Sequence, residues 1–232
     1  MELTREQIWM NKRAKCYATA SVCPNLMKGG RAKGVDWGES AKDVLFAAKY
    51  QHRTGLQLEQ KDLFQFKWGH EQEPNAVEWL RAQTMDEVKS CESDFDQIVF
   101  QQPFEGFGDS PDAFILNADG SIKVVVEIKC PVDQVKIEKL REEISIHDKH
   151  EYYWQFIAHM IGTPEADELW WVIFDGYNDE GHIVKMYRKD HLANIEKLTA
   201  RIKDAIYVVK KCIEDPANYK IGNIETILNE RK

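Results

Sequence analysis

The chain has 232 residues, 43% of them hydrophobic, and a formal net charge of −8. This length suffices for a sizeable α/β core, and we expect a single domain over residues 1–232. No stretch approaches the roughly 18 apolar residues of a membrane helix, and residues 1–16 lack the apolar segment of a signal peptide. Five cysteines without a Cys-x-x-Cys pair argue against a zinc ribbon and a disulfide framework. We therefore expect a soluble protein of the cytoplasm.

Basic residues are concentrated near the amino terminus, although the chain as a whole is acidic. Residues 1–33 contain seven lysines and arginines against two glutamates, a local net charge of +5 that leaves −13 for the remainder. A basic helix and loop over residues 1–36 could contact phosphates. A solvated surface helix would have the same composition.

The order of periodic segments predicts both helices and strands. Residues 4–7 have the pattern of a capping box that opens a first helix, and residues 40–50 suit a second. Further helices are expected after Trp68, around residues 153–161 and, as a long amphipathic helix, over 190–214. The expected strands are 97–102, 107–116, 123–130, 168–175 and 182–188. This mixture predicts an α/β (α+β) fold with a central mixed sheet flanked by helices.

Ionisable residues surround one predicted hairpin. Asp112 leaves a short β run, a turn at Asp119-Gly120 reverses the chain, and an apolar strand then leads to Glu127 and Lys129. Because side chains at i and i+2 share one face of a strand, Glu127 and Lys129 should point the same way and Ile128 the other way. Two carboxylates and one ammonium group are thus expected to converge at the end of a buried hairpin.

Such buried charge is costly unless a partner compensates it. Asp112, Glu127 and the backbone carbonyl of Ile128 offer the hard oxygen ligands that suit Mg²⁺, with Mn²⁺ as a substitute. Lys129 could orient or deprotonate a metal-bound water and offset charge at a phosphorus centre. The pattern therefore predicts phosphodiester hydrolysis. The alternative is a strand-edge salt bridge between Glu127 and Lys129.

Three other polar residues are candidates for the same centre. Glu73, in the helix expected after Trp68, could supply another carboxylate, or could be an ordinary exposed helix acid. Gln155 is the polar member of an apolar helix stripe and could reach a scissile phosphate, or could be a core-edge glutamine. Ser21 stands at an expected helix start, where a hydroxyl and free N–H groups favour a phosphate, or it could be a simple N-cap.

A family resemblance rests on five motifs in order. They are Thr-Ala-Ser at 19–21, Trp-Gly-x-x-x-Glu-Pro at 68–74, Ser-Pro-Asp at 110–112, Glu-Ile-Lys-Cys-Pro at 127–131 and Tyr-x-x-Gln at 152–155. Together they resemble the phage lambda exonuclease family of viral-type recombination nucleases, in the restriction-endonuclease-like PD-(D/E)xK superfamily. The resemblance implies a restriction-endonuclease-like core and Mg²⁺-dependent 5′-to-3′ exonuclease activity on linear double-stranded DNA. It also implies 3′ overhangs for a single-strand annealing protein, a homotrimeric ring around the duplex and, for a phage or prophage protein, the cytoplasm of a bacterial host.

The resemblance further implies roles for individual residues. Asp112 and Glu127 match the metal ligands, Lys129 matches the catalytic lysine, and Glu73 matches a helical acid near the metals. The positions near the terminal phosphate or the scissile group are matched by Ser21, Ser110 and Gln155.

The chain departs from the family pattern at three positions. The family arginine that holds the 5′-phosphate falls on Ala14, and Arg13 is its candidate substitute. Ile157 replaces a second glutamine after the tyrosine, and Ala113 replaces the glycine after Ser-Pro-Asp. None of these changes removes Asp112, Glu127 or Lys129.

Two alternative functions are compatible with the same residues. A structure-specific or site-specific DNA endonuclease of the resolvase type would use Asp112, Glu127 and Lys129 in the same way. A non-catalytic DNA-end-binding protein would not need them. The expected phosphate pocket of Arg13 and Ser21 favours the exonuclease.

Overall fold

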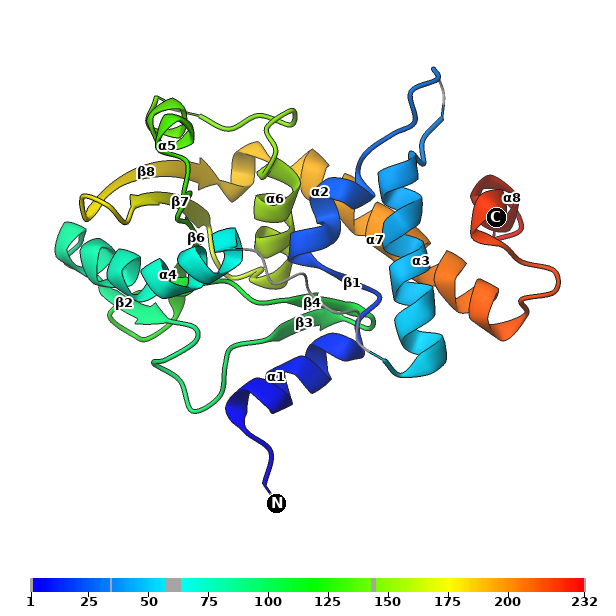
Figure 1. Ribbon diagram of the computed structural model, residues 1–232, viewed down its shortest axis with the longest axis horizontal. Coiled ribbons are helices and arrows are strands. Elements are labelled where there is room, and N and C mark those ends of the chain that lie inside the picture. The colour runs from blue at the N-terminus through cyan, green and yellow to red at the C-terminus, as the bar shows by residue number, and fades with distance from the viewer. Residues whose placement is uncertain (1, 34, 57–63, 143–144, 232) are drawn as a thin grey trace.

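The computed structural model describes residues 2–33, 35–56, 64–142 and 145–231; Gly34, in the predicted basic loop, lies outside them. Within these residues the strands form a three-stranded and a five-stranded sheet (Figure 1). The first has the order β1 (Ala18–Thr19), β4 (Phe107–Asp109), β3 (Gln101–Phe104). The second has the order β2 (Glu87–Ser90), β5 (Ala113–Leu116), β6 (Ile122–Lys129), β7 (Glu168–Asp175), β8 (Glu180–Tyr187). Because β6 pairs with β7 in parallel and with β5 antiparallel, the predicted mixed sheet is confirmed.

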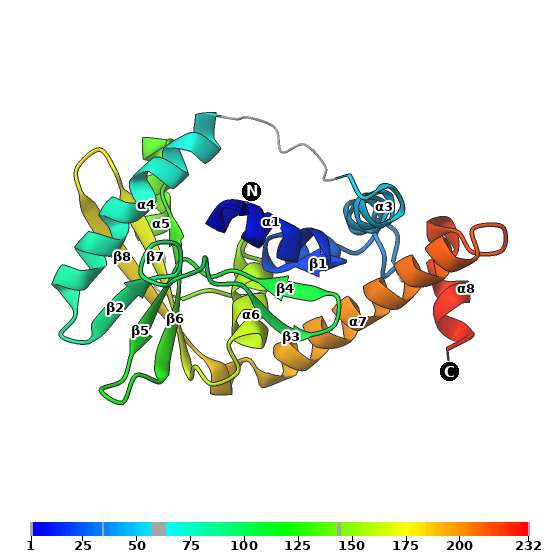
Figure 2. The same cartoon turned by 90° about the horizontal axis from the view of Figure 1, so that it is seen from below.

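Helices cover both faces of the five-stranded sheet. On one face, α4 (Phe64–Gln83) packs its buried residues Ala76, Val77 and Leu80 against the strands. On the other face, α6 (Tyr153–Gly162) and α7 (Leu192–Glu214) belong to a larger apolar cluster that also includes α3 (Glu39–Thr54). Figure 2 shows α4 and α6 on opposite sides of the strands. The other helical segments are α1 (Arg5–Ala14), η1 (Ala20–Val22), α2 (Cys23–Leu26), α5 (Gln134–Arg141), η2 (Arg188–Asp190), η3 (Ile221–Asn223) and α8 (Ile224–Asn229).

The residues of β6 alternate between these two faces. Val126 and Ile128 belong to the apolar cluster under α4, whereas Val125 belongs to the cluster on the α6 side. Because alternate residues of a strand face the same side, Glu127 and Lys129 face α6. The predicted shared face of Glu127 and Lys129, with Ile128 opposite, is confirmed.

Several predicted elements form close to their expected bounds. The side chain of Thr4 accepts from the Gln7 N–H and the side chain of Gln7 accepts from the Thr4 N–H, which is the predicted capping box of α1. The second predicted helix is longer than expected and ends at Gly55, whose φ of +70° favours glycine. The strand predicted at 168–175 is β7. Among the described residues, no helix is both long and apolar enough to cross a membrane.

The predicted single strand at 107–116 is wrong. The chain instead forms β4 and β5, which belong to different sheets and are separated by Ser110, Pro111 and Asp112. Proline has no N–H group to donate, so Pro111 cannot continue a ladder through this point. This interruption leaves Asp112 at the start of the hairpin formed by β5 and β6.

Two other predictions needed correction. Only residues 101–102 of the strand predicted at 97–102 are in β3, because the Val99 N–H donates to Cys91 O in a loop instead. Thr19-Ala20-Ser21 spans the end of β1 and the start of η1, and α2 then continues for only four residues. The short elements β2 and α5 were not predicted, because their sequences are polar and lack a clear apolar period.

Candidate active site

The β5–β6 hairpin brings together the three residues that dominate the sequence pattern. Asp112 directly precedes β5, and its N–H donates to Val126 O at 3.2 Å. The Oδ2 atom of Asp112 accepts from the Ile128 N–H at 2.6 Å. Lys129 Nζ lies 2.5 Å from Glu127 Oε1. The predicted convergence of two carboxylates and one ammonium group is therefore present.

A cavity of about 500 Å³ opens at this end of the hairpin. Asp112, Glu127, Ile128 and Lys129 line one side of it, and Glu73 of α4 lines another. The other predicted site residues are not among its described lining residues; they are Arg13, Ser21, Ser110 and Gln155. Glu73 thus joins the central three residues as predicted, whereas the remaining four lie outside the described lining of this cavity.

The charges around the cavity are unbalanced. Burial raises the pKa of Asp112 well above its usual value, and the neighbouring carboxylates of Glu127 and Glu73 raise it further. Burial, Glu92 and Glu127 raise the pKa of Glu73 to about 7. Burial opposes the ionised form of Lys129, but Glu127 and Asp112 outweigh it and raise the lysine pKa, so this side chain stays protonated. One ammonium group therefore stands against three carboxylates.

This donor set fits a divalent metal ion. The raised pKa values of Asp112 and Glu73 mean that both groups resist ionisation unless more positive charge enters the cavity. Carboxylate oxygens are the ligands that Mg²⁺ and Mn²⁺ prefer, and a carboxylate pair with open positions suits an ion that retains waters. Asp112 and Glu127 would hold the ion with the Ile128 carbonyl, and Glu73 is the further candidate ligand.

Glu73 also belongs to a second group of polar side chains. His70, Glu73 and Glu92 each offer a ligand atom, and these atoms lie within 4.8 Å of one another. His70 Nε2 is 3.9 Å from Glu92 Oε1, and both side chains are well exposed. The proximity of Glu92 is one reason why Glu73 resists ionisation.

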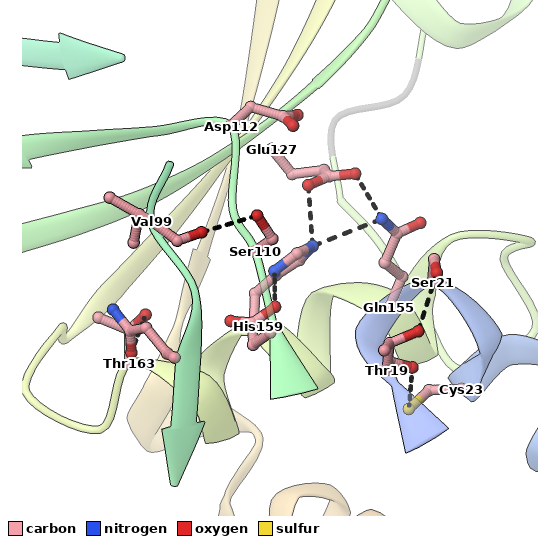
Figure 3. A network of polar contacts seen from close by, with 12 residues as sticks. Thr19, Ser21, Cys23, Val99, Ser110, Asp112, Glu127, Gln155, His159 and Thr163 are labelled. Atoms are coloured by element: carbon pink, nitrogen blue, oxygen red, sulfur yellow. Dashed lines mark hydrogen bonds and ion pairs between the residues drawn. The ribbon is translucent and has the colours of Figure 1, made fainter. Parts of the chain in front are cut away.

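The Glu127 carboxylate has three polar partners, two of them on α6. Gln155 Nε2 donates to Oε1 at 2.5 Å, the oxygen that Lys129 also contacts. His159 Nε2 lies 2.8 Å from the other oxygen, Oε2. Figure 3 shows the Gln155 amide and the His159 ring both directed at this carboxylate. Burial opposes the ionised form of Glu127, but Lys129 and His159 outweigh it and lower the pKa to about 2.

Sequence reasoning did not identify His159 or its second partner, Asp109. His159 Nδ1 lies 2.7 Å from Asp109 Oδ1, and both residues are 1% exposed. Within the described part of the chain neither Asp109 oxygen has a well-aligned hydrogen bond, so the contact is an ion pair. Burial would lower the pKa of His159, but the two carboxylates raise it well above its usual value. The spacing of Gln155 and His159 was the sequence feature that could have identified the histidine, because residues i and i+4 share one face of a helix.

Two of the predicted phosphate-binding residues, Arg13 and Ser21, lie together near α6. Arg13 of α1 donates through Nη2 to Ser21 Oγ at 3.1 Å, and Thr19 Oγ1 lies 3.2 Å from the same oxygen. The segment η1, which carries Ser21, packs against α6. Ser110 is instead held by its neighbours, since its hydroxyl donates to Val99 O at 2.8 Å and accepts from Trp9 Nε1 at 3.1 Å.

Residues 4–165 match the family model of the YqaJ-like viral recombinase domain. The chain belongs to this family. The match covers well over half of the chain, and it confirms the resemblance to viral-type recombination nucleases. No curated protein sequence matches the chain.

Solved structures of exonucleases share the fold of this YqaJ-like family member. An alkaline exonuclease, LHK-Exo, from Laribacter hongkongensis has a TM-score of 0.69 and 21% identity, covering 98% of each chain. LHK-Exo in complex with dAMP has a TM-score of 0.67 and 21% identity over 90% of this chain and 94% of that one. A phage-related exonuclease from Haemophilus somnus 129PT has a TM-score of 0.64 and 14% identity over 90% of this chain and all of its own. The restriction-endonuclease-like fold predicted from the motifs is therefore confirmed.

The departures of this YqaJ-like chain from the lambda exonuclease pattern have local explanations. Ile157 of α6 is completely buried in the apolar core, where a second glutamine would need buried partners. Ala113 is completely buried in β5 and pairs with Val126. Arg13 reaches Ser21 although it precedes the expected arginine position by one residue.

Proposed function

We propose that the protein is a Mg²⁺-dependent exonuclease that digests linear double-stranded DNA from its 5′ ends and leaves 3′ single-stranded overhangs. The observation that carries this proposal is the cavity lined by Asp112, Glu127 and the protonated Lys129. Such a site can hold a cation and a phosphodiester together, with the ammonium group facing the developing negative charge. Family membership supports a role in recombination.

The residues of the cavity divide the chemical tasks. Asp112, Glu127 and the Ile128 carbonyl would bind Mg²⁺, for which Mn²⁺ would substitute, and Glu73 would bind it directly or through water. When bound, this ion would activate a water molecule and offset charge on the phosphate oxygens. Lys129 is held protonated by its neighbours, so it would orient the nucleophile and the phosphate rather than remove a proton. Gln155 would orient the Glu127 carboxylate, with which it is already hydrogen bonded.

The basic amino-terminal segment supports a preference for 5′-phosphate ends. Arg13 and Ser21 present a guanidinium group and a hydroxyl next to η1, which packs on the helix that carries Gln155. A guanidinium with a hydroxyl is a suitable pair for a terminal phosphate. Ser110 would act indirectly, because its hydroxyl is occupied by Trp9 and Val99.

The resemblance to the lambda exonuclease family also underlies three broader parts of the proposal. The protein would act as a homotrimer around the duplex, it would deliver its overhangs to a single-strand annealing protein, and it would work in the cytoplasm of a bacterial host.

Digestion of a linear duplex labelled separately at each 5′ and 3′ end tests the activity and its polarity. With Mg²⁺ we expect loss of the 5′ labels first and retention of the 3′ labels, and with a chelator we expect no digestion. A closed circular duplex serves as the control and should stay intact. Cleavage of the circle at a similar rate would reject the exonuclease and favour the endonuclease alternative. Binding without any digestion would favour a DNA-end-binding protein.

A further inference from the structure

A buried chain of three ionisable side chains crosses from one sheet to the other behind the active-site cavity. Asp109 stands at the end of β4 in the three-stranded sheet, and Glu127 stands in β6 of the five-stranded sheet. His159 of α6 lies between them, with its ring nitrogens 2.7 Å from Asp109 Oδ1 and 2.8 Å from Glu127 Oε2. All three are at most 2% exposed, so they interact with one another and with little bulk water.

The fold provides space for this arrangement. Gly162 ends α6, and a Cβ atom at this position would overlap the Asp109 carboxylate. The carboxylate can approach the helix this closely only because residue 162 has no side chain. Asp109 is therefore fitted against α6, on the same helix as the histidine that it contacts.

The contact with Glu127 Oε2 differs from the other contacts of that carboxylate. Lys129 and Gln155 both reach Oε1, whereas His159 is the described side chain that reaches Oε2. Rotation of the carboxylate about its last bond moves both oxygens, so fixing Oε1 alone leaves the position of Oε2 less restricted. A partner on each side holds the carboxylate plane in one orientation, and ligand orientation governs metal affinity.

We propose that His159 is a positioning residue that fixes the metal-binding carboxylate of Glu127, and that Asp109 in turn fixes the His159 ring. This inference rests on the proposed metal-dependent function. A purely structural histidine, which only joins β4 to α6 and β6, would affect folding without affecting metal affinity in the folded protein.

The inference is tested by titrating the full chain with Mn²⁺ in the absence of DNA and measuring the binding by calorimetry. Two double variants are compared, D109N/H159Q and D109N/H159L. Each removes the Asp109 charge together with the ring, so neither leaves that carboxylate buried without its partner. They differ in whether an N–H group can reach Glu127 Oε2.

We expect D109N/H159L to bind Mn²⁺ about 10- to 100-fold more weakly than the wild type, the range found when partners of metal ligands are lost. D109N/H159Q should bind at least about threefold more tightly than D109N/H159L, because the glutamine amide restores part of the contact. In digestion assays the Mg²⁺ concentration for half-maximal rate should rise while the KM for DNA ends stays unchanged.

His191→Gln is the matched control. His191 Nδ1 also contacts α6, at 3.0 Å from the Tyr153 hydroxyl, but no described contact joins it to Asp109 or Glu127. This variant should bind Mn²⁺ with wild-type affinity. Thermal unfolding of the metal-free variants measures any structural effect separately.

Equal Mn²⁺ affinities of the two double variants, whether near wild type or equally reduced, would overturn the positioning role. If D109N/H159L does not fold, Asp109→Asn alone provides the test, since it keeps the ring and removes its charged anchor; wild-type affinity in that variant would overturn the inference. A wild type that binds no Mn²⁺ would overturn the proposed function itself. That outcome is distinct from a wild type that binds Mn²⁺ and variants that bind it equally well.

Discussion

Replacement of Lys129 by methionine removes the ammonium group and keeps most of the length of the side chain. In the structure Lys129 Nζ is 2.5 Å from Glu127 Oε1, and the lysine side chain is 24% exposed while that of Glu127 is 3% exposed. Loss of one such preorganised electrostatic contact costs about 3–4 kcal/mol in the transition state. That corresponds to a fall of about 10²- to 10³-fold in the rate of the chemical step.

Single-turnover digestion of end-labelled duplex at saturating Mg²⁺ measures this loss, and DNA binding is measured separately by anisotropy in a chelator. Binding should change little, because most phosphate contacts of a DNA-binding protein lie outside the reacting centre. Lys136→Met is the control, since Lys136 lines the same cavity but is paired with Glu151 at 2.8 Å; we expect it to cost less than about tenfold. A Lys129→Met rate within tenfold of the wild type would remove Lys129 from the mechanism.

Three further predictions concern the ends of DNA, the pH dependence and the packing. Arg13→Ala should bring the ratio of digestion rates on 5′-phosphate and 5′-hydroxyl ends toward one, and an unchanged ratio would exclude Arg13 from the end pocket. Because the folded-state pKa of Glu73 is raised to about 7, the metal-free protein should lose stability as pH rises from the unfolded value of about 4.3 toward 7. Glu73→Gln should therefore raise the melting temperature in chelator at pH 8 but not at pH 4, and equal gains at both would contradict this reasoning. Gly162→Ala should destabilise by about 1–3 kcal/mol in chemical denaturation because its Cβ overlaps Asp109. Gly69→Ala is the control and should not destabilise the protein, because a Cβ atom at residue 69 would meet open space.

Local patterns were sufficient to predict the centre of the site. The period of two along β6 places Glu127 and Lys129 on one face, and the Asp119-Gly120 turn sets the hairpin that returns the chain to Asp112. Gly120 has a φ of +84°, as the predicted turn requires. These relations span few residues, so backbone geometry alone determines them.

The partners of Glu127 on α6 could not be predicted in the same way. Asp109 and His159 are fifty positions apart and meet only because two sheets and a helix pack together. The division of the predicted strand at Pro111 is also essential, because it places Asp109 at the end of β4 in one sheet and Asp112 directly before β5 of the other sheet. Only the packing of the whole chain reveals that Asp109 faces the back of the site and Asp112 faces the cavity.

The different positions of Asp109 and Asp112 determine the formal charge of the cavity. Asp109 and His159 form a pair whose formal charges cancel behind the cavity. On the cavity side, the three carboxylates of Asp112, Glu127 and Glu73 face the single ammonium group of Lys129, which leaves a formal charge of −2. A divalent cation would neutralise that charge, and the raised pKa values of Asp112 and Glu73 indicate how unfavourable the charge is without one. If Asp109 were absent, the His159 charge would offset part of this surplus and weaken the attraction for a cation. By cancelling the formal charge of His159, Asp109 would preserve this surplus for the proposed metal ion.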